Sequence, residues 1–193
     1  MIRQLRSAPN LLTLLRLIFV PITVIAVLQR RWMVALVIFV IAGVSDGLDG
    51  LLARLLKQKT VLGQYLDPIA DKLLLSTMFL VLSFMRQIPW VVTVLVFSRD
   101  IMILIVCTLL YATGAMTRFQ PSWFGKANTV AQIATVPVVL LHQVFPDLRC
   151  LALLRQFGFN ATMVLTVVSG VHYLVRVALD LRHTGPKEEG SGS

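Results

Sequence analysis

The hydrophobic positions of the chain fall into six long apolar runs separated by short polar connections. The runs cover Leu11–Leu28, Met33–Leu56, Asp67–Met85, Trp90–Ala112, Lys126–Val144 and Phe157–Leu179. A helix needs about 20 mostly apolar residues to cross a bilayer, and each run is close to that length or longer. We therefore predict an all-α protein, an integral membrane bundle of six transmembrane helices.

The polar connections are too short to hold a separate soluble domain. They are predicted at Gln29–Trp32, Lys57–Leu66, Arg86–Pro89, Thr113–Gly125 and Phe145–Gln156. Residues 1–189 are expected to form one membrane domain, whereas Gly190–Ser193 looks like a remnant of an expression vector. Met1–Pro9 fits either a short interfacial helix or an irregular tail. No signal-peptide cleavage pattern follows the first run, so we expect that run to stay in the mature protein.

Composition and charge agree with a lipid environment. The chain is 57% hydrophobic and 14% charged, whereas a soluble protein carries about 25% charged residues. The net charge of +9 could indicate nucleic-acid binding, but the basic residues flank the apolar runs. With both termini in the cytoplasm, ten lysines and arginines fall on the cytoplasmic side and five on the opposite side. This asymmetry favours a membrane protein with cytoplasmic termini, although the Arg30-Arg31 pair opposes it.

Acidic residues within the apolar runs carry the strongest functional signal. Five of the nine acidic residues fall in or at the ends of the predicted spans: Asp46, Asp49, Asp67, Asp71 and Asp100. A carboxylate at the bilayer centre costs about 2.5–3.5 kcal/mol, so such residues are expected to face the bundle interior and to serve a function. Buried ion pairing is the alternative, but only Arg54 and Lys72 lie nearby in sequence to neutralise the first four.

The spacing of these carboxylates predicts a metal site. Asp46 and Asp49 are three residues apart, and Asp67 and Asp71 are four apart, so each pair shares one helix face. A connection of about ten residues containing Gly63 allows an antiparallel hairpin that brings the pairs together. Ligation by oxygen alone suits Mg²⁺ or Mn²⁺, and no histidine lies within the cluster to favour zinc.

The same segment resembles a family signature. It reads Asp46-Gly-Leu-Asp49-Gly50-Leu-Leu-Ala53-Arg54, then eight residues, then Gly63-Gln-Tyr-Leu-Asp67-Pro-Ile-Ala-Asp71. This is similar to the pattern D-x-x-D-G-x-x-A-R, eight residues, G-x-x-x-D-x-x-x-D of the CDP-alcohol phosphotransferases. All fixed positions match. The resemblance implies an enzyme that transfers the phosphatidyl group of CDP-diacylglycerol to an alcohol and releases CMP.

The resemblance also implies residue roles. One or two Mg²⁺ or Mn²⁺ ions would be held by Asp46, Asp49, Asp67 and Asp71. The CDP pocket would be formed by Asp46, Asp49, Gly50, Ala53, Arg54, Gly63 and Asp67. Asp71 would act as the general base on the acceptor hydroxyl. We predict direct in-line attack, with a phosphatidyl-enzyme as the alternative. A homodimer in the bacterial inner membrane, with the site near the cytoplasmic face, is implied as well.

The acceptor alcohol is predicted from two further segments. Ser98-Arg99-Asp100 and Gly125-Lys126-Ala127-Asn128-Thr129 resemble the cardiolipin synthases of this family more than its phosphatidylglycerophosphate synthases. The latter usually show Arg-Glu at the first segment and a second lysine at the position of Asn128. A phosphomonoester also carries about two charges and needs more cations than a phosphodiester. We favour phosphatidylglycerol as acceptor, with glycerol 3-phosphate as the alternative.

Acceptor contacts are expected from cationic residues near these segments. Arg99 and Lys126 are the predicted phosphate contacts, although Arg99 could instead pair with Asp100 and Lys126 could be a simple membrane anchor. Lys72 could balance the carboxylates or contact headgroups. Residues of the first span that could line the substrate pocket are Asn10, Thr13 and Arg16. Arg16 could equally extend to the membrane interface.

A cation or proton transporter is the competing class of protein. Intramembrane aspartates suit such a protein, but the inverted repeats and broken helices common in transporters are not visible in the sequence. CMP release in detergent, without any ion gradient, distinguishes the enzyme from the transporter.

Overall fold

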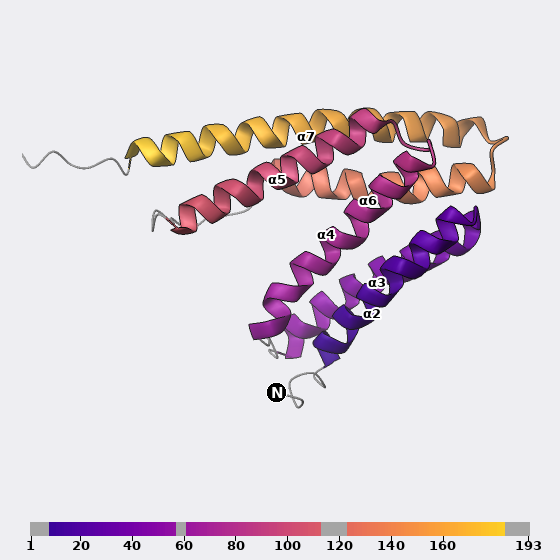
Figure 1. Ribbon diagram of the computed structural model, residues 1–193, viewed down its shortest axis with the longest axis horizontal. Helices are drawn as coiled ribbons and strands as arrows, with labels where there is room; N and C mark the ends of the chain where they lie inside the picture. Colours follow the sequence, from indigo (N-terminus) through magenta and orange to yellow (C-terminus); the bar gives the residue numbers. More distant parts are fainter. Residues whose placement is uncertain (1–7, 57–60, 113–122, 184–193) are drawn as a thin grey trace, which may run out of the picture.

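The computed structural model describes residues 8–56, 61–112 and 123–183, with side chains described for 18–45, 72–106, 108 and 123–179. These described residues form helices and no strand, which confirms the all-α prediction (Figure 1). The helices are α2 (Ala8–Leu28), α3 (Trp32–Leu56), α4 (Val61–Phe84), α5 (Trp90–Ala112), α6 (Trp123–Val144) and α7 (Arg149–His183). The expected interfacial helix over Met1–Pro9 falls almost entirely outside the described residues, since only its last two residues belong to α2.

The start of α4 differs from the prediction. The helix begins at Val61 rather than at Asp67, so the predicted connection Lys57–Leu66 is wrong from Val61 onward. Gly63 therefore lies in a helix and not in a loop. An Asp-Pro pair such as Asp67-Pro68 is typical of a helix start, which is why the pattern places the boundary too late.

The start of α7 is the second correction. The connection predicted at Phe145–Gln156 is helical from Arg149 onward. The apolar run from Phe157 onward predicts only the part of the helix that lipid can surround. The helix itself begins earlier and includes polar residues such as Arg155. Cys150, expected in a loop, lies in this first turn of α7 and is a free, exposed thiol.

The helices pack as two groups that meet along one seam. In the first group, α2 packs against α3 and α4, and in the second group, α7 packs against α5 and α6. The groups touch where α3 and α4 meet α6 and where α4 meets α5. The turns α2–α3, α4–α5 and α6–α7 all lie at one end of the bundle, on the right of Figure 1. This end is called the turn end below.

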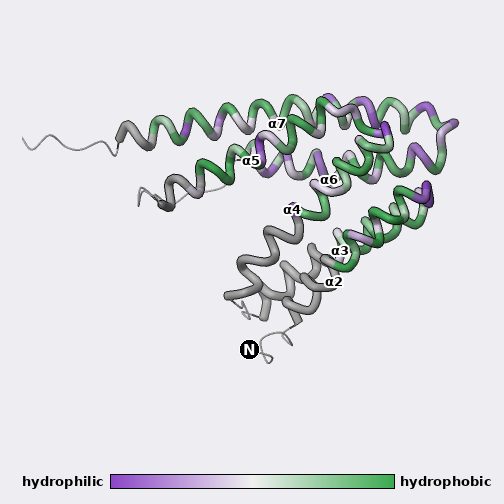
Figure 2. Tube along the Cα trace, in the orientation of Figure 1, coloured by the Kyte–Doolittle hydropathy of each residue, from purple (hydrophilic) through white to green (hydrophobic). Residues whose placement is uncertain are grey.

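Two helices of the described part are long and apolar enough to cross a membrane: α6, and α7 from Arg149 to Leu179. Shorter apolar helical stretches cover Ile18–Leu28, Trp32–Ser45 and Lys72–Phe84. Figure 2 shows hydrophobic residues along the described length of most helices. The structure therefore supports the membrane class without confirming all six predicted spans.

The distribution of polar and apolar side chains suits lipid surroundings. Large apolar side chains are exposed on the outer faces, for example Val130 at 66%, Leu153 at 73% and Phe157 at 71%. The interior is a core of apolar side chains such as Phe79, Leu82 and Val139. Polar side chains are buried beside it, and they include Asn128, Gln132, Thr135, Thr162, Thr166 and Ser169. In a membrane, helices gain little from burying apolar groups and pack through small and polar residues. This arrangement is therefore expected for a bundle surrounded by acyl chains.

The α6–α7 contact is close because of a glycine. A Cβ atom on Gly158 would lie 2.9 Å from Oγ1 and 3.3 Å from Cγ2 of Thr135. Thr135 is held in place, because its hydroxyl donates to the Ala131 carbonyl at 2.7 Å and lies 3.2 Å from Thr162 Oγ1. Both γ atoms of Thr135 face the glycine, so rotation of the threonine would not clear the space.

Substitution of Gly158 by alanine is therefore expected to lower the free energy of unfolding by about 1–3 kcal/mol, the usual cost of overpacking. Gly43→Ala is the matched control, because a Cβ atom there has nothing within 4 Å and alanine is the better helix former. Thermal unfolding in one detergent would compare the two variants. Equal midpoints would contradict this account of the α6–α7 contact.

Two helices end on an arginine in the left-handed conformation. Arg30 follows α2 with φ 57°, and Arg86 follows α4 with φ 58°. Each turn is closed by the same hydrogen bonds: the Arg31 amide reaches the Ala26 carbonyl at 2.9 Å, and the Gln87 amide reaches the Leu82 carbonyl at 2.8 Å. Glycine is the preferred residue at this helix-capping position, and a side chain there costs about 1 kcal/mol.

Candidate functional site

The four aspartates of the signature lie on two helices. The backbone places Asp46 and Asp49 in the second half of α3, and Asp67 and Asp71 in the first half of α4. Both stretches are away from the turn end. The side chains of these residues lie outside the described part of the structure, so their convergence on a metal stays a prediction. Among the side chains that are described, no group of three or more potential ligands gathers.

Other predicted site residues also fall outside the described side chains. For the CDP pocket these are Gly50, Ala53, Arg54 and Gly63, and for the first span they are Asn10, Thr13 and Arg16. The backbone places the first three in α3, Gly63 in α4 and the last three in α2. Their assigned roles stay predictions.

A cavity of about 220 Å³ lies on the seam between the two helix groups. Its lining comes from α3, α4, α5 and α6. The apolar part of the lining consists of Phe39, Ala42, Gly43, Leu74, Leu75 and Ile133. The polar part consists of Lys72, Arg99, Asp100, Thr129 and Gln132. Lys72 directly follows Asp71 in the chain, so the cavity adjoins the helical segment that carries the second aspartate pair.

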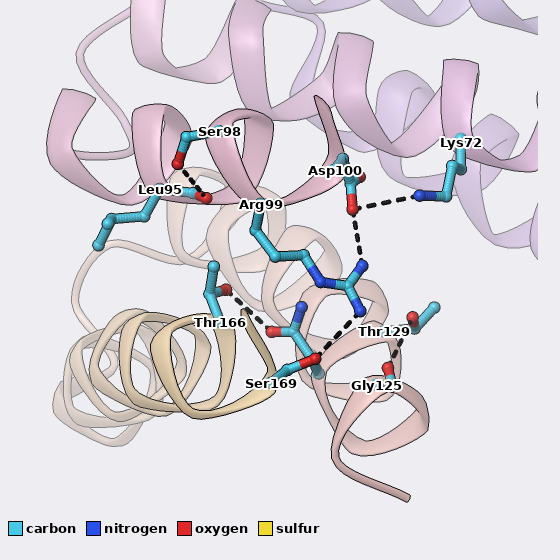
Figure 3. Close-up of polar contacts among 10 residues, drawn as sticks. Lys72, Leu95, Ser98, Arg99, Asp100, Gly125, Thr129, Thr166 and Ser169 are labelled. Atoms are coloured by element: carbon cyan, nitrogen blue, oxygen red, sulfur yellow. Dashed lines mark hydrogen bonds and ion pairs between the residues drawn. The ribbon is translucent and has the colours of Figure 1, made fainter. Parts of the chain in front are cut away.

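Three charged side chains of the cavity form one ion-pair network (Figure 3). Asp100 Oδ1 lies 2.7 Å from Arg99 Nη1 and 3.2 Å from Lys72 Nζ. Arg99 also donates from Nη2 to Ser169 Oγ on α7 at 3.1 Å. The side chains of Arg99 and Asp100 are 12% and 17% exposed, whereas that of Lys72 is 49% exposed. These two cations and one carboxylate leave one net positive charge.

The site also holds buried donors without a protein partner. At the cavity they are Nε of Arg99 and Nε2 of Gln132, and Nδ2 of Asn128 lies one helical turn before Gln132 without lining the cavity. The amide oxygen of Asn128 is fixed, because it accepts a hydrogen bond from Thr166 at 2.9 Å. Buried polar atoms are nearly always hydrogen-bonded, so donors left over around one cavity suit an oxygen-rich ligand.

Close packing of α7 shapes the position of Arg99. A Cβ atom on Gly170 would lie 3.9 Å from Arg99 Cγ and 3.6 Å from Met102 Cε. The glycine follows Ser169, the hydrogen-bond partner of Arg99. One turn of α7 thus lies beside the arginine stem and holds its head through the Ser169 hydroxyl.

Only one of the two predicted phosphate contacts lines the cavity. Arg99 lines the cavity, and the pairing with Asp100 that was considered as its alternative role is present. Lys126 is exposed near the start of α6, with Nζ 5.8 Å from the centre of the Trp123 ring, and does not line this cavity. Sequence reasoning missed Gln132. Its position four residues after Asn128, on the same face of α6, was the available signal.

Comparison with known proteins identifies the family. The sequence profile of the CDP-alcohol phosphatidyltransferases matches residues 6–171. A probable phosphatidylglycerophosphate synthase of Mycobacterium tuberculosis is 32% identical over 184 residues, 92% of this chain and 85% of the relative. The cardiolipin synthase (CMP-forming) of Rattus norvegicus is 35% identical over 155 residues, 72% of this chain and 51% of the relative. The CDP-diacylglycerol–glycerol-3-phosphate 3-phosphatidyltransferase of Haemophilus influenzae is 31% identical over 174 residues, 87% and 91% of the two chains.

The chain therefore belongs to the CDP-alcohol phosphatidyltransferase family, an enzyme class of phospholipid synthesis. This confirms the resemblance of the aspartate signature and favours the enzyme over the transporter. The relatives are named for two different acceptors, so similarity alone does not select between phosphatidylglycerol and glycerol 3-phosphate.

Proposed function

We propose that this enzyme transfers the phosphatidyl group of CDP-diacylglycerol to a hydroxyl of phosphatidylglycerol, producing cardiolipin and CMP. The observation that carries the choice of acceptor is the net charge of the cavity. Lys72, Asp100 and Arg99 together leave one positive charge. That charge matches the single negative charge of a phosphodiester, whereas a phosphomonoester brings about two.

The apolar lining of the cavity supports the same acceptor. Phe39, Leu74, Leu75 and Ile133 provide contacts for acyl chains or a glycerol backbone. Glycerol 3-phosphate is small and polar, and it would leave such a surface without a matching group. The exposed Lys72 would meet the headgroup first, and Arg99, whose side chain is much less exposed, would hold its phosphate.

The aspartates would supply the reaction chemistry. As oxygen donors paired on helical faces, Asp46, Asp49, Asp67 and Asp71 fit one or two Mg²⁺ or Mn²⁺ ions. Such ions neutralise the diphosphate charge of the donor. Asp71 takes the proton of the acceptor hydroxyl. The hydroxyl oxygen forms a bond to the phosphatidyl phosphorus, and the bond from that phosphorus to the CMP oxygen breaks.

The proposed setting is a six-span bundle in the bacterial inner membrane, present as a homodimer. The apolar outer faces of all described helices support the six spans. Most of the lysines and arginines fall on the same side of the predicted spans as the two chain termini, which favours a cytoplasmic location for that side. The signature aspartates lie toward this side, so the active site is proposed near the cytoplasmic face. Cross-linking and cysteine accessibility in membranes would test the dimer and the orientation.

A direct assay tests the proposed reaction. Purified protein would receive CDP-diacylglycerol and Mg²⁺ with either phosphatidylglycerol or glycerol 3-phosphate, and CMP and lipid products would be followed. Cardiolipin formed only with phosphatidylglycerol is the expected result. Product with glycerol 3-phosphate alone would reject the proposed acceptor while keeping the family reaction.

Glycerol 3-phosphate remains the second candidate acceptor. Two relatives that align over most of their length are named for that product or substrate. In this case a further cation would have to complete the cavity. Lys126 is the residue that the sequence predicts for this role, although it is exposed and lies against the Trp123 ring.

The charge argument gives a prediction at Asp100. Asp100→Asn removes the carboxylate that neutralises one of the two positive charges of Lys72 and Arg99. The net charge of the cavity therefore rises by one. We expect the ratio of kcat/KM for glycerol 3-phosphate to that for phosphatidylglycerol to rise by roughly fivefold, about 1 kcal/mol of added phosphate attraction. Asp147→Asn, the same change in the α6–α7 turn, should leave this ratio unchanged. An unaltered ratio in Asp100→Asn would reject the charge-matching argument.

A further inference from the structure

The turn end of the bundle carries a cluster of arginines that the proposed reaction does not use. Among the described residues, this end holds Arg30, Arg31, Arg86, Arg149 and Arg155, with Asp147 as its acidic residue. Figure 2 shows hydrophilic residues at the three turns of this end. The signature aspartates lie in the other halves of α3 and α4. These arginines also oppose the positive-inside distribution of the chain.

A second cavity opens among these residues. Its volume is about 540 Å³, and its polar lining includes Ser83, Arg86, Gln87, Arg155 and Gln156. The rest of the lining consists of Ile88, Pro89, Trp90, which is 52% exposed, and the buried Phe159. The cavity therefore joins the α4–α5 turn to the first turns of α7. Tryptophan at such a position is typical of the membrane interface.

Among the residues whose side chains are described, no carboxylate neutralises the two arginines of the cavity. Arg155 lies 3.4 Å from His142 Nδ1 and 5.9 Å from the centre of the Phe159 ring, and neither is an anion. Its Nε is buried and has no hydrogen-bond partner. Within the described residues, no carboxylate is paired with Arg86 or Arg155. An arginine guanidinium offers several donors suited to phosphate oxygens.

The backbone conformation of Arg86 is a second feature of this cavity. Its φ of 58° is a conformation that favours glycine, so the arginine is held there at a cost to folding. Such a conformation is a reason to ask what the Arg86 side chain contacts, and that side chain lines the cavity. Arg30 repeats the arrangement at the neighbouring α2–α3 turn, with φ 57°.

We propose that the cavity of Arg86 and Arg155 binds the phosphate of an anionic phospholipid in the leaflet opposite the signature aspartates. The arginines would hold the phosphate, Gln87 and Gln156 would face the polar headgroup, and Trp90 would lie at the level of the interface. This site is separate from the acceptor cavity and does not depend on the identity of the acceptor.

The test measures lipid-dependent stability of the full chain in detergent. Binding to the folded state raises the unfolding midpoint with ligand concentration. The probes are phosphatidylserine, which has no headgroup hydroxyl to act as acceptor, phosphatidylcholine, and inorganic phosphate. We expect the midpoint to rise with phosphatidylserine and to stay unchanged with phosphatidylcholine. An equal rise with inorganic phosphate would assign the site to free phosphate and overturn the lipid assignment.

Variants locate the binding. Arg86→Gly is the sharpest, because glycine suits the backbone and should keep or raise the midpoint without lipid. The same variant is expected to weaken phosphatidylserine binding about fivefold, the usual contribution of one basic residue near an anionic surface. Arg155→Gln should have at least this effect. Lys126→Gln, at the other end of α6, is the control and should bind as the unaltered protein does.

The result that overturns the proposal is equally definite. If Arg86→Gly and Arg155→Gln retain full phosphatidylserine binding and Arg99→Gln loses it, the lipid binds in the acceptor cavity instead. Failure of the enzyme assay would leave this test untouched, because it needs neither CDP-diacylglycerol nor a metal.

Discussion

Asp71→Asn is expected to lower the rate of CMP release by about 10²–10⁴-fold, the range that a general base contributes. Asparagine keeps the size of the side chain but has no basic oxygen to accept the proton of the acceptor hydroxyl. It also removes a negative charge from the proposed metal site, which adds to the loss. The measurement is CMP release from CDP-diacylglycerol at saturating Mg²⁺ and acceptor.

Asp147→Asn is the matched control for this change. Asp147 lies in the exposed α6–α7 turn, at the end of the bundle away from the signature aspartates. Its replacement should leave kcat within about twofold, as expected for surface substitutions away from functional groups. If Asp71→Asn retains most of its activity while remaining folded, Asp71 is not the base. The metal assignment would then need a separate titration with Mg²⁺ and Mn²⁺.

Arg99→Gln is expected to reduce kcat/KM for the acceptor by about 10–100-fold, mainly through KM. The Arg99 side chain is only 12% exposed, and a hydrogen bond to a charged group is worth about 1.5–3 kcal/mol. Glutamine keeps polar donors but cannot hold a phosphate through two parallel bonds. Initial rates over a range of acceptor concentrations, at saturating CDP-diacylglycerol, would separate KM from kcat.

Two further variants complete the Arg99 experiment. Lys126→Gln should change KM little, because Lys126 is exposed and lies against Trp123 rather than in the cavity. Ser169→Ala removes the hydroxyl that accepts from Arg99 at 3.1 Å, and a smaller rise of KM is expected. A larger effect at Lys126 than at Arg99 would reverse the assignment of the phosphate contact.

The sequence predicted the helical class, because apolar runs near 20 residues leave few alternatives to helices. It placed both ends of α3 and α5 within one residue, and it placed the starts of α2 and α6 three residues too late. It placed the starts of α4 and α7 too late. In both cases the helix begins before the apolar run that predicted it. Backbone hydrogen bonds extend the helix through turns that contain polar residues, and hydropathy does not detect those bonds.

The candidate site was predictable in part. The aspartate signature identified the family from local spacing, and Arg99 was recognised beside Asp100. Lys72 and Ser169 contact Asp100 and Arg99, and Gln132 lines the same cavity as they do; these three residues come from three different helices. Their association depends on how α4, α6 and α7 pack around α5, and no local pattern in a single sequence encodes that packing.

The seam between the two helix groups has a mechanical consequence for the acceptor cavity. Lys72 is anchored in the first group, whereas Arg99 and Asp100 belong to the second. The 3.2 Å ion pair between Lys72 and Asp100 therefore spans the seam. Sliding of one group past the other by about one ångström would lengthen that ion pair and widen the cavity. The Lys72–Asp100 ion pair therefore couples the width of the cavity to the relative position of the two helix groups.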